Sequence, residues 1–570
     1  MSHAAFLSAI RSSPDDDTAR LVYADYLDEQ GTAADAARAE FVRLQIRLAS
    51  LDEIDPARPA LEDRENELLR EHERKWLGTV PASLARGLLT WRFERGFLGA
   101  VNCDKKTVAA HGATFFKRHP IGRVELSGGD EESIPALARR AWWEHVRELD
   151  TGDYTSTSID TYEPLVASPR LTNLRRLAVS AHGLIDCSTR LPEVLARCPS
   201  LARLEELHVR DYRQDMAALL PVLEATAVRA LRMSGGSFTI RGLRALLTSA
   251  FAARPIRLEL ENGNLGAALW PALNGKKVQP VLARASFNGT GRNPDLDLPR
   301  LLASHAAANL HALDASETKL AGAKVREIIK SGFLARATEL GLTRCHVNAK
   351  VMASLAQTDA PHLRKLTLGE TGLRNAGAFA LCDARWADCL THLDLMRNYL
   401  DDQALIAMAN SGRFVSLRTL DLRVNSPDLG NDCRTEIGDA GVIAMASAPN
   451  FARLRHLNLY RTRVTVRGVD ALLNSPHCRL AELELGGYDL GSDLPTVLAN
   501  SPGLARLTKL ALSFTPSLGG GALMPVAESP HLSPLCRLDI RYNNTGAKVS
   551  AALAARLGRR LENHPAVGTW

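Results

Sequence analysis

The sequence predicts an α/β solenoid of about sixteen repeats, with a parallel inner sheet and an outer layer of helices, preceded by a small all-α domain. Three observations support this prediction. The pattern L-x-x-L-x-L returns about every 27 residues from residue 121 onward, a helix-forming stretch follows each copy, and residues 1–95 differ in composition from the rest. One strand and one helix cannot bury their apolar sides alone, so neighbouring repeats must stack.

The strand pattern identifies the individual repeats. Successive copies begin 24 to 30 residues apart, except for one interval of 37 residues. The clearest copies are LTHLDLMRNYL from Leu390, LRTLDLRVN from Leu417, LRHLNLYRTRV from Leu454, LAELELGGYDL from Leu480 and LTKLALSF from Leu507. Weaker copies begin at Ile121, Val146, Leu174, Leu204, Val228, Pro255, Leu282, Leu310, Ala337, Leu363 and Leu535.

The segments after the strands predict helices, because Ala, Leu, Val and Ile recur in them at helical spacing, as in residues 375–387, 401–412, 438–449 and 466–476. One position after the strand holds Asn398, Asn425 and Asn543, whose amides can bond backbone groups at the bend, while Cys345 and Thr371 occupy it in other copies.

These residues resemble leucine-rich repeats of the long, helix-backed, ribonuclease-inhibitor-like kind, over roughly residues 120–560. The resemblance implies a curved solenoid. A fold of this kind says almost nothing about function.

The first 95 residues form a separate acidic segment, with 13 Lys and Arg against 18 Asp and Glu. Helices are predicted over residues 4–13, over residues 18–30 with Gly31 as their end, around Phe41 and Leu44, and over residues 61–78 with Trp76. We expect Trp76, Phe41 and Leu44 to be buried. The predicted organisation is a helical domain over residues 1–95, a linker and N-terminal cap over 96–120, and the repeat array with its C-terminal helix over 121–570.

The run FLSAIRSSPDDDTARLVYADYLDEQG, with RAEFVRLQIRL, RKWLG and ERGFL after it, resembles the bacterial repeat-companion domain family. Tyr26 is a departure, since the family's ADWL-like motif has Trp there, but the change keeps an aromatic residue. The resemblance implies a helical cap beside a repeat array and a bacterial source. It implies no chemistry.

Composition limits the classes of function. A net charge of only +6 over 570 residues argues against a protein that neutralises nucleic-acid phosphates. No apolar run reaches the roughly 18 residues that a membrane span needs, and the N-terminus becomes acidic before a secretory core could form. The nine cysteines are scattered and contain no C-x-x-C pair, which indicates reduced thiols and a cytoplasmic location.

Catalytic and metal-binding motifs are missing from the sequence, including the phosphate loop, H-E-x-x-H, G-x-S-x-G and the EF-hand loop. Asn274 to Lys277 imitates the end of a phosphate loop but lacks its earlier glycine and following hydroxyl. Asp15, Asp16 and Asp17, with Asp25 and Asp28, are explained as helix caps more simply than as a cation site. His208, His392 and His456 lie in non-adjacent repeats, which disfavours a metal site. We therefore expect no enzyme activity, no cofactor, no metal and no small-molecule substrate.

The exposed positions of the repeats form the candidate binding surface. The fifth position of the pattern carries an acidic row: Asp150, Glu259, Asp314, Asp394, Asp421, Glu484 and Asp539. The seventh and eighth positions of the C-terminal repeats carry Arg and aromatic side chains, which dominate binding hot spots. The predicted partner-binding residues are Arg423, Tyr460, Arg461, Phe514, Arg541 and Tyr542. The alternative is that Arg and Asp merely pair across neighbouring strands.

The interval of 37 residues inserts a loop over residues 426–436, which is either a functional loop or a neutral insertion. The leading hypothesis is a non-catalytic bacterial scaffold or recognition protein that binds a protein through its concave repeat face. A second is a sensing or regulatory subunit of a separately encoded enzyme system, such as a protease or defence effector. A third, an unrecognised enzyme in residues 1–95, is disfavoured because so small a module offers few convergent polar groups.

Overall fold

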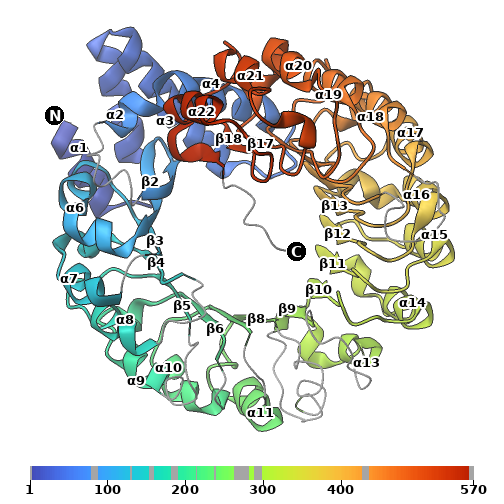
Figure 1. Ribbon diagram of the computed structural model, residues 1–570. Coiled ribbons are helices and arrows are strands. Elements are labelled where there is room, and N and C mark those ends of the chain that lie inside the picture. The colour runs from blue at the N-terminus through green and yellow to red at the C-terminus, as the bar shows by residue number, and fades with distance from the viewer. Residues whose placement is uncertain are drawn as a thin grey trace. The chain divides into compact units, whose positions relative to one another are not determined.

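A computed structural model describes residues 3–78, 88–128, 131–152, 159–180, 190–212, 215–235, 239–261, 272, 282–287, 298–425 and 436–563. The chain divides into two compact units, Met1–Leu310 and His311–Trp570. Within each unit the strands lie side by side and the helices cover one side of the sheet (Figure 1).

The first unit opens with four helices: α1 (His3–Ser12), α2 (Thr18–Gln30), α3 (Ala33–Ser50) and α4 (Arg58–Leu77). Gly31 ends α2 in the left-handed conformation (φ +71°), a role for which glycine is suited. Phe41 and Leu44 are buried as expected, but Trp76 is only partly buried, although its ring centroid lies 4.5 Å from that of Phe41.

These helices share their core with the sheet. Phe6, Ile10 and Tyr23 pack in one apolar cluster with Phe97 of strand β2 (Phe97–Asp104). The guanidinium of Arg11 also donates to the carbonyl oxygens of residues 116, 117 and 119, at the C-terminal end of helix α6 (Lys105–Arg118). Helices and first strands therefore bury one continuous core inside the first unit.

The sheet of the first unit begins with β1 (Leu88–Glu94), which pairs antiparallel with β2 (Phe97–Asp104). From β2 onward each strand pairs in parallel with the next. These strands are β3 (Arg123–Ser127), β4 (Glu148–Asp150), β5 (Arg176–Ser180), β6 (Glu206–Arg210), β7 (Ala230–Ser234), β8 (Arg257–Glu261) and β9 (Leu282–Ser286). The helices between them are α6 (Lys105–Arg118), α7 (Ile134–Ala138), α8 (Ile159–Val166), α9 (Leu191–Ala196), α10 (Leu220–Glu224), α11 (Ile240–Thr248) and, after β9, α13 (Leu298–Leu302). The segment 96–120 thus contains β2 and α6.

The second unit continues the same alternation, and each of its strands pairs in parallel with the next. Its strands are β10 (Ala312–Asp314), β11 (Glu339–Gly341), β12 (Lys365–Thr367), β13 (His392–Asp394), β14 (Thr419–Asp421), β15 (His456–Asn458), β16 (Glu482–Glu484), β17 (Lys509–Ala511), β18 (Arg537–Asp539) and β19 (Leu561–Glu562). Its helices are α14 (Gly322–Lys330), α15 (Ala349–Ala356), α16 (Arg374–Cys382), α17 (Asp402–Asn410), α18 (Asp439–Ala446), α19 (Val466–Leu473), α20 (Leu494–Asn500), α21 (Met524–Glu528) and α22 (Ala547–Leu557).

Strands β3 to β18, all within the described residues, match the predicted repeat copies one for one. Each begins two residues after the predicted start of its copy, except β9, which begins at Leu282 itself. The residue at the fourth position of the repeat pattern is at most 2% exposed in each of these strands, as with Leu393 and Leu420. The fold is a leucine-rich repeat solenoid, as predicted. Strand β19 after the last helix is an element that the repeat pattern does not predict.

The predicted asparagines bond neighbouring repeats together. Asn398 is fully buried, and its Oδ1 accepts the backbone N–H groups of Thr371 and Leu373, both at 3.1 Å. Its Nδ2 donates to the carbonyl oxygen of Leu368 at 2.7 Å. Asn425 makes the equivalent bonds one repeat later, and Asn543 bonds the repeat before it in the same way. These amides satisfy backbone groups that burial would otherwise leave unpaired.

Candidate functional site

The acidic row at the fifth position has a structural role. Each of its aspartates accepts the backbone N–H of the residue two positions later, at 2.8 to 3.0 Å, and so closes the turn that ends the strand. Asn458 makes the same bond to the N–H of Tyr460 at 3.0 Å. Sequence reasoning found this row but not its function, because the bond depends on the turn geometry.

The eighth residue of each repeat in the second unit has a left-handed backbone. These residues have φ between +50° and +78°, and they are Glu317, Arg344, Glu370, Arg397, Val424, Arg461, Gly487, Phe514 and Tyr542. We call them the eighth-position row. This conformation costs an L-residue about 1 kcal/mol or more. Bonds between repeats hold it, as when the N–H of Arg461 donates to the carbonyl oxygen of Gly486 at 2.8 Å.

The first half of the eighth-position row is a chain of ion pairs. Arg344 lies 2.7 Å from Glu317 and 2.8 Å from Glu370, and Arg397 lies 3.1 Å from Glu370. Acid and base alternate from one repeat to the next. For these residues the alternative to partner binding is correct: charged side chains on neighbouring strands pair with one another.

The second half of the row is aromatic. The rings of Phe514 and Tyr542 stack with their centroids 4.2 Å apart and their planes 19° apart, and Tyr542 is 41% exposed. The guanidinium of Arg461 lies 5.7 Å from the ring centroid of Tyr460. A Cβ on Gly487 would lie 2.4 Å from Arg461 Cγ, so glycine leaves the space that the Arg461 side chain fills.

Two of the predicted binding residues are engaged within their own repeats. Arg541 donates to both carboxylate oxygens of Asp539, at 2.9 and 2.7 Å, and its Nη2 lies 3.4 Å from Glu562. Arg423 lies 3.2 Å from Asp421. Both arginines thus pair with the Asp of their own strand, and Arg541 also pairs across strands, with Glu562 of β19. Tyr460, Arg461, Phe514 and Tyr542 are the predicted residues that such pairing does not explain.

A shallow cavity of about 430 Å³ lies beside this surface, lined by Tyr460, Leu485, Ser513, Arg541 and neighbouring charged side chains. The cations that line it have partners. Lys509 pairs with Glu484, and Arg537 pairs with Glu562. A hydrogen bond from His456, which lies 3.1 Å away on the preceding strand, lowers the pKa of Glu482.

The fifth-position aspartates of the second unit differ in the direction in which their pKa is shifted. Burial raises the pKa of Asp421 to about 6, with a further contribution from the neighbouring Asp394. Burial also raises the pKa of Asp394. At Asp539 burial acts in the same direction, but the hydrogen bonds from Arg541 outweigh it and the pKa is lowered.

The strand surface of the first unit is an array of paired charges. Glu148 accepts from both Arg123, at 2.5 Å, and Arg176, at 2.9 Å. Arg210 forms two bonds to Asp150, at 2.9 and 2.6 Å. Pairs of this kind leave little charge free for a partner, so this surface is a weaker candidate.

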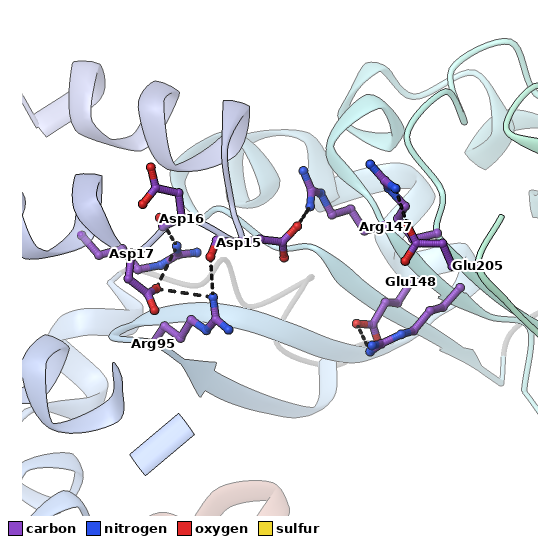
Figure 2. A network of polar contacts seen from close by, with 10 residues as sticks. Asp15, Asp16, Asp17, Arg95, Arg147, Glu148 and Glu205 are labelled. Carbon is purple, nitrogen blue, oxygen red and sulfur yellow. Dashed lines mark hydrogen bonds and ion pairs between the residues drawn. The ribbon is translucent and has the colours of Figure 1, made fainter. Parts of the chain in front are cut away.

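The aspartates of the N-terminal turn also bind arginines (Figure 2). Asp15 lies 2.5 Å from Arg147, and Asp17 lies 3.4 Å from both Arg20 and Arg95. Asp16 accepts from the backbone N–H and the hydroxyl of Thr18, which lowers its pKa. Asp25 and Asp28 both contact Arg43, at 2.6 and 2.7 Å. The contacts of Asp15 and Asp17 tie the turn before α2 to residues beside the first strands, and those of Asp25 and Asp28 tie α2 to α3. Asp17 occupies the N-cap position of α2 but makes no side-chain cap bond there, unlike the expectation from the sequence.

The described parts of the chain do not form a metal-binding cluster. No three His, Cys, Asp or Glu side chains there are arranged to hold a metal ion. His208 bonds Ser234 Oγ at 2.8 Å, and burial lowers its pKa to about 4. Burial raises the pKa of the Cys478 and Cys536 thiols to about 12, which keeps them protonated and unreactive. The segment Asn274 to Lys277 lies outside the described residues, as does 426–435 of the insertion.

Among the described helices, none combines the length and the apolar character needed to cross a bilayer. No protein-family model and no curated protein matches the chain. Similar solved structures include a chain of the Rad7 and Elc1 complex in yeast, 16% identical over 63% of this chain and 84% of that one, with a TM-score of 0.41. Another is an internalin (inlF) from Listeria monocytogenes, 15% identical over 77% of this chain and 95% of that one, with a TM-score of 0.25. Neither likeness bears on partner or activity.

Proposed function

We propose that this chain is a non-catalytic recognition protein that binds another protein through the C-terminal part of its repeat surface. The binding residues would be Tyr460, Arg461, Phe514 and Tyr542, with Arg423 and Arg541 at the border. The observation that carries the proposal is the change along the eighth-position row, from alternating ion pairs to an aromatic stack in which Phe514 is half-buried and Tyr542 is exposed.

Ion pairing and core packing do not explain that stack. Tyr542 is 41% exposed and has a left-handed backbone, an arrangement that costs free energy and buries little apolar surface. Aromatic side chains beside an Arg supply large contact area with directed hydrogen bonds, which is the composition of protein-binding hot spots. The surface therefore favours a protein partner over a phosphate-rich one.

The proposal also covers the domain organisation of the chain, its bacterial source and its location in the cytoplasm. Residues 1–95 would form the companion-type helical domain, 96–120 its link to the array, and 121–570 the repeats. The motif run in residues 6–31 supports this assignment and a bacterial source. Free thiols at Cys103, Cys345 and Cys478 fit a reducing cytoplasm.

Affinity capture of the tagged, full-length protein from its native cytoplasm tests the proposal. Tyr460→Ala with Tyr542→Ala should weaken a captured stoichiometric partner about thirtyfold, which corresponds to about 2 kcal/mol. Phe379→Ala is the matched control, because Phe379 lies on α16 of the same unit and is similarly exposed, at 44%. Equal retention by wild type and the double Tyr variant would contradict this site. An activity assay on the captured complex then separates a scaffold from a regulatory subunit.

A further inference from the structure

The charges around Arg461 differ from those around the other arginines of the eighth-position row. Arg344 and Arg397 each have Glu370 on a neighbouring repeat. At the same position, the neighbours of Arg461 are Val424 and Gly487, and neither carries a charge.

The strand that leads to Arg461 also lacks an acid. Its fifth residue is Asn458, where the repeats of Arg423 and Arg541 have Asp421 and Asp539. The nearest acid on the next strand is engaged already, since Glu484 accepts from Asn458 Nδ2 at 2.9 Å and pairs with Lys509. Four positions around Arg461 that hold acids in other repeats are therefore neutral, as at Val424, Gly487 and Asn458, or already engaged, as at Glu484.

The guanidinium of Arg461 consequently has no carboxylate partner in the part of the chain that the structure describes. Its contact is with the Tyr460 ring, at 5.7 Å from the centroid, which orients the group without neutralising it. A guanidinium in this state binds a carboxylate through two parallel hydrogen bonds.

The aromatic stack lies within reach of the same ligand. Phe514 and Tyr542 follow β17 and β18, which are two and three strands beyond β15. At about 4.8 Å between strands, that separation is roughly 10 to 14 Å, which an extended peptide spans in about three or four residues. We propose that the partner presents an acidic peptide segment in which an Asp or Glu binds Arg461 and an aromatic or large aliphatic side chain, about three or four residues away, packs on Phe514 and Tyr542.

This inference rests on the proposed function and specifies the chemistry of its partner. A nucleic acid is disfavoured, because a phosphate backbone needs several cations and Arg461 is a single one. The cations that line the adjoining cavity, Lys509, Arg537 and Arg541, are already paired with Glu484, Glu562 and Asp539, so they are not free to bind a phosphate backbone. One carboxylate beside apolar groups matches the charge of the surface.

Selection from a displayed library of random twelve-residue peptides on the full-length protein tests the inference. Selected peptides should be enriched in Asp or Glu three or four residues from Trp, Tyr, Phe or Leu. Arg461→Gln should weaken such a peptide about tenfold or more, the usual effect of losing a charge-assisted hydrogen bond. Arg397→Gln is the matched control, since Arg397 occupies the same position but is paired with Glu370. Its effect should be less than twofold.

The outcomes separate the inference from the proposed function. One outcome is that peptides lose affinity for the double Tyr variant but bind Arg461→Gln as tightly as wild type. This outcome would overturn the inference that the partner segment is acidic, and it would leave the proposed function standing. A selection that returns no peptide, or only peptides indifferent to both tyrosines, would contradict both. Binding of a random single-stranded oligonucleotide that is lost in Arg461→Gln would also overturn the inference. An unchanged melting temperature for Arg461→Gln shows that the variant is folded.

Discussion

The raised pKa of Asp421 predicts how stability depends on pH. Its side chain is 20% exposed and pairs in register with Asp394 on one side and Asn458 on the other. Burial, with a contribution from Asp394, raises the pKa from 3.8 to about 6. The folded state therefore binds a proton more readily than the unfolded state, and the protonated form stabilises the fold. That stabilisation is fully present below about pH 4 and is lost as the pH rises through 6.

The size of the effect follows from the pKa difference. Each pKa unit corresponds to about 1.4 kcal/mol, so the displacement from 3.8 to about 6 sets an upper bound of about 3 kcal/mol. Because the side chain is partly exposed, solvent screening reduces this to about 1 to 2 kcal/mol. The ionised Asp421 thus lowers the free energy of unfolding at neutral pH.

Asp421→Asn removes this charge and keeps the turn. Asn458, one strand away, shows that an amide oxygen can accept the same backbone N–H. The substitution should raise the free energy of unfolding by about 1 to 2 kcal/mol at pH 7.5 and by close to nothing at pH 4. The lost contact to Arg423 costs little, since that guanidinium is 44% exposed.

Urea unfolding followed by circular dichroism, at pH values from 4 to 7.5, measures the difference between variant and wild type. Asp539→Asn is the matched control, because hydrogen bonds from Arg541 lower the pKa of Asp539. That substitution should destabilise the protein at pH 7.5, the opposite sign. If Asp421→Asn is destabilising at pH 7.5, or if its effect does not change with pH, the reasoning is wrong.

Three further substitutions test the packing. Asn398→Ala should cost about 3 kcal/mol or more in urea unfolding, because it leaves several buried backbone groups unpaired, and a loss below 1 kcal/mol would contradict its bridging role. Trp76→Ala should cost about 2 kcal/mol and lower the melting temperature, since the indole packs on Phe41, whereas an unchanged melt would mean a loosely attached helix. Gly486→Ala should cost about 3 kcal/mol or more in the same unfolding assay, because its Cβ would lie 2.1 Å from a backbone oxygen, while Gly412→Ala, with open space, should cost about 1 kcal/mol. Equal losses for the two glycines would refute the contact.

Properties that repeat along the chain could be predicted from the sequence. Leu393 and Leu420 occupy the same place in a local pattern, and stacking buries both for the same reason. Asn398 and Asn425 were likewise found by their position after the strand. Gly31 marked the end of α2, because a left-handed helix end favours glycine. Each of these features depends on residues close in sequence.

The partners of surface charges were decided by the tertiary structure. Asp421 and Asn458 are separated by the longest interval between repeats, yet they lie in register on adjacent strands. Phe97, far along the chain from α1, completes the core of the N-terminal helices. The sequence by itself determined the repeat, its buried face and the candidate surface. Only the stacking of repeats determined that Arg397 is paired while Arg461 has no carboxylate partner among the described residues, because ion pairing depends on which residues meet across neighbouring strands.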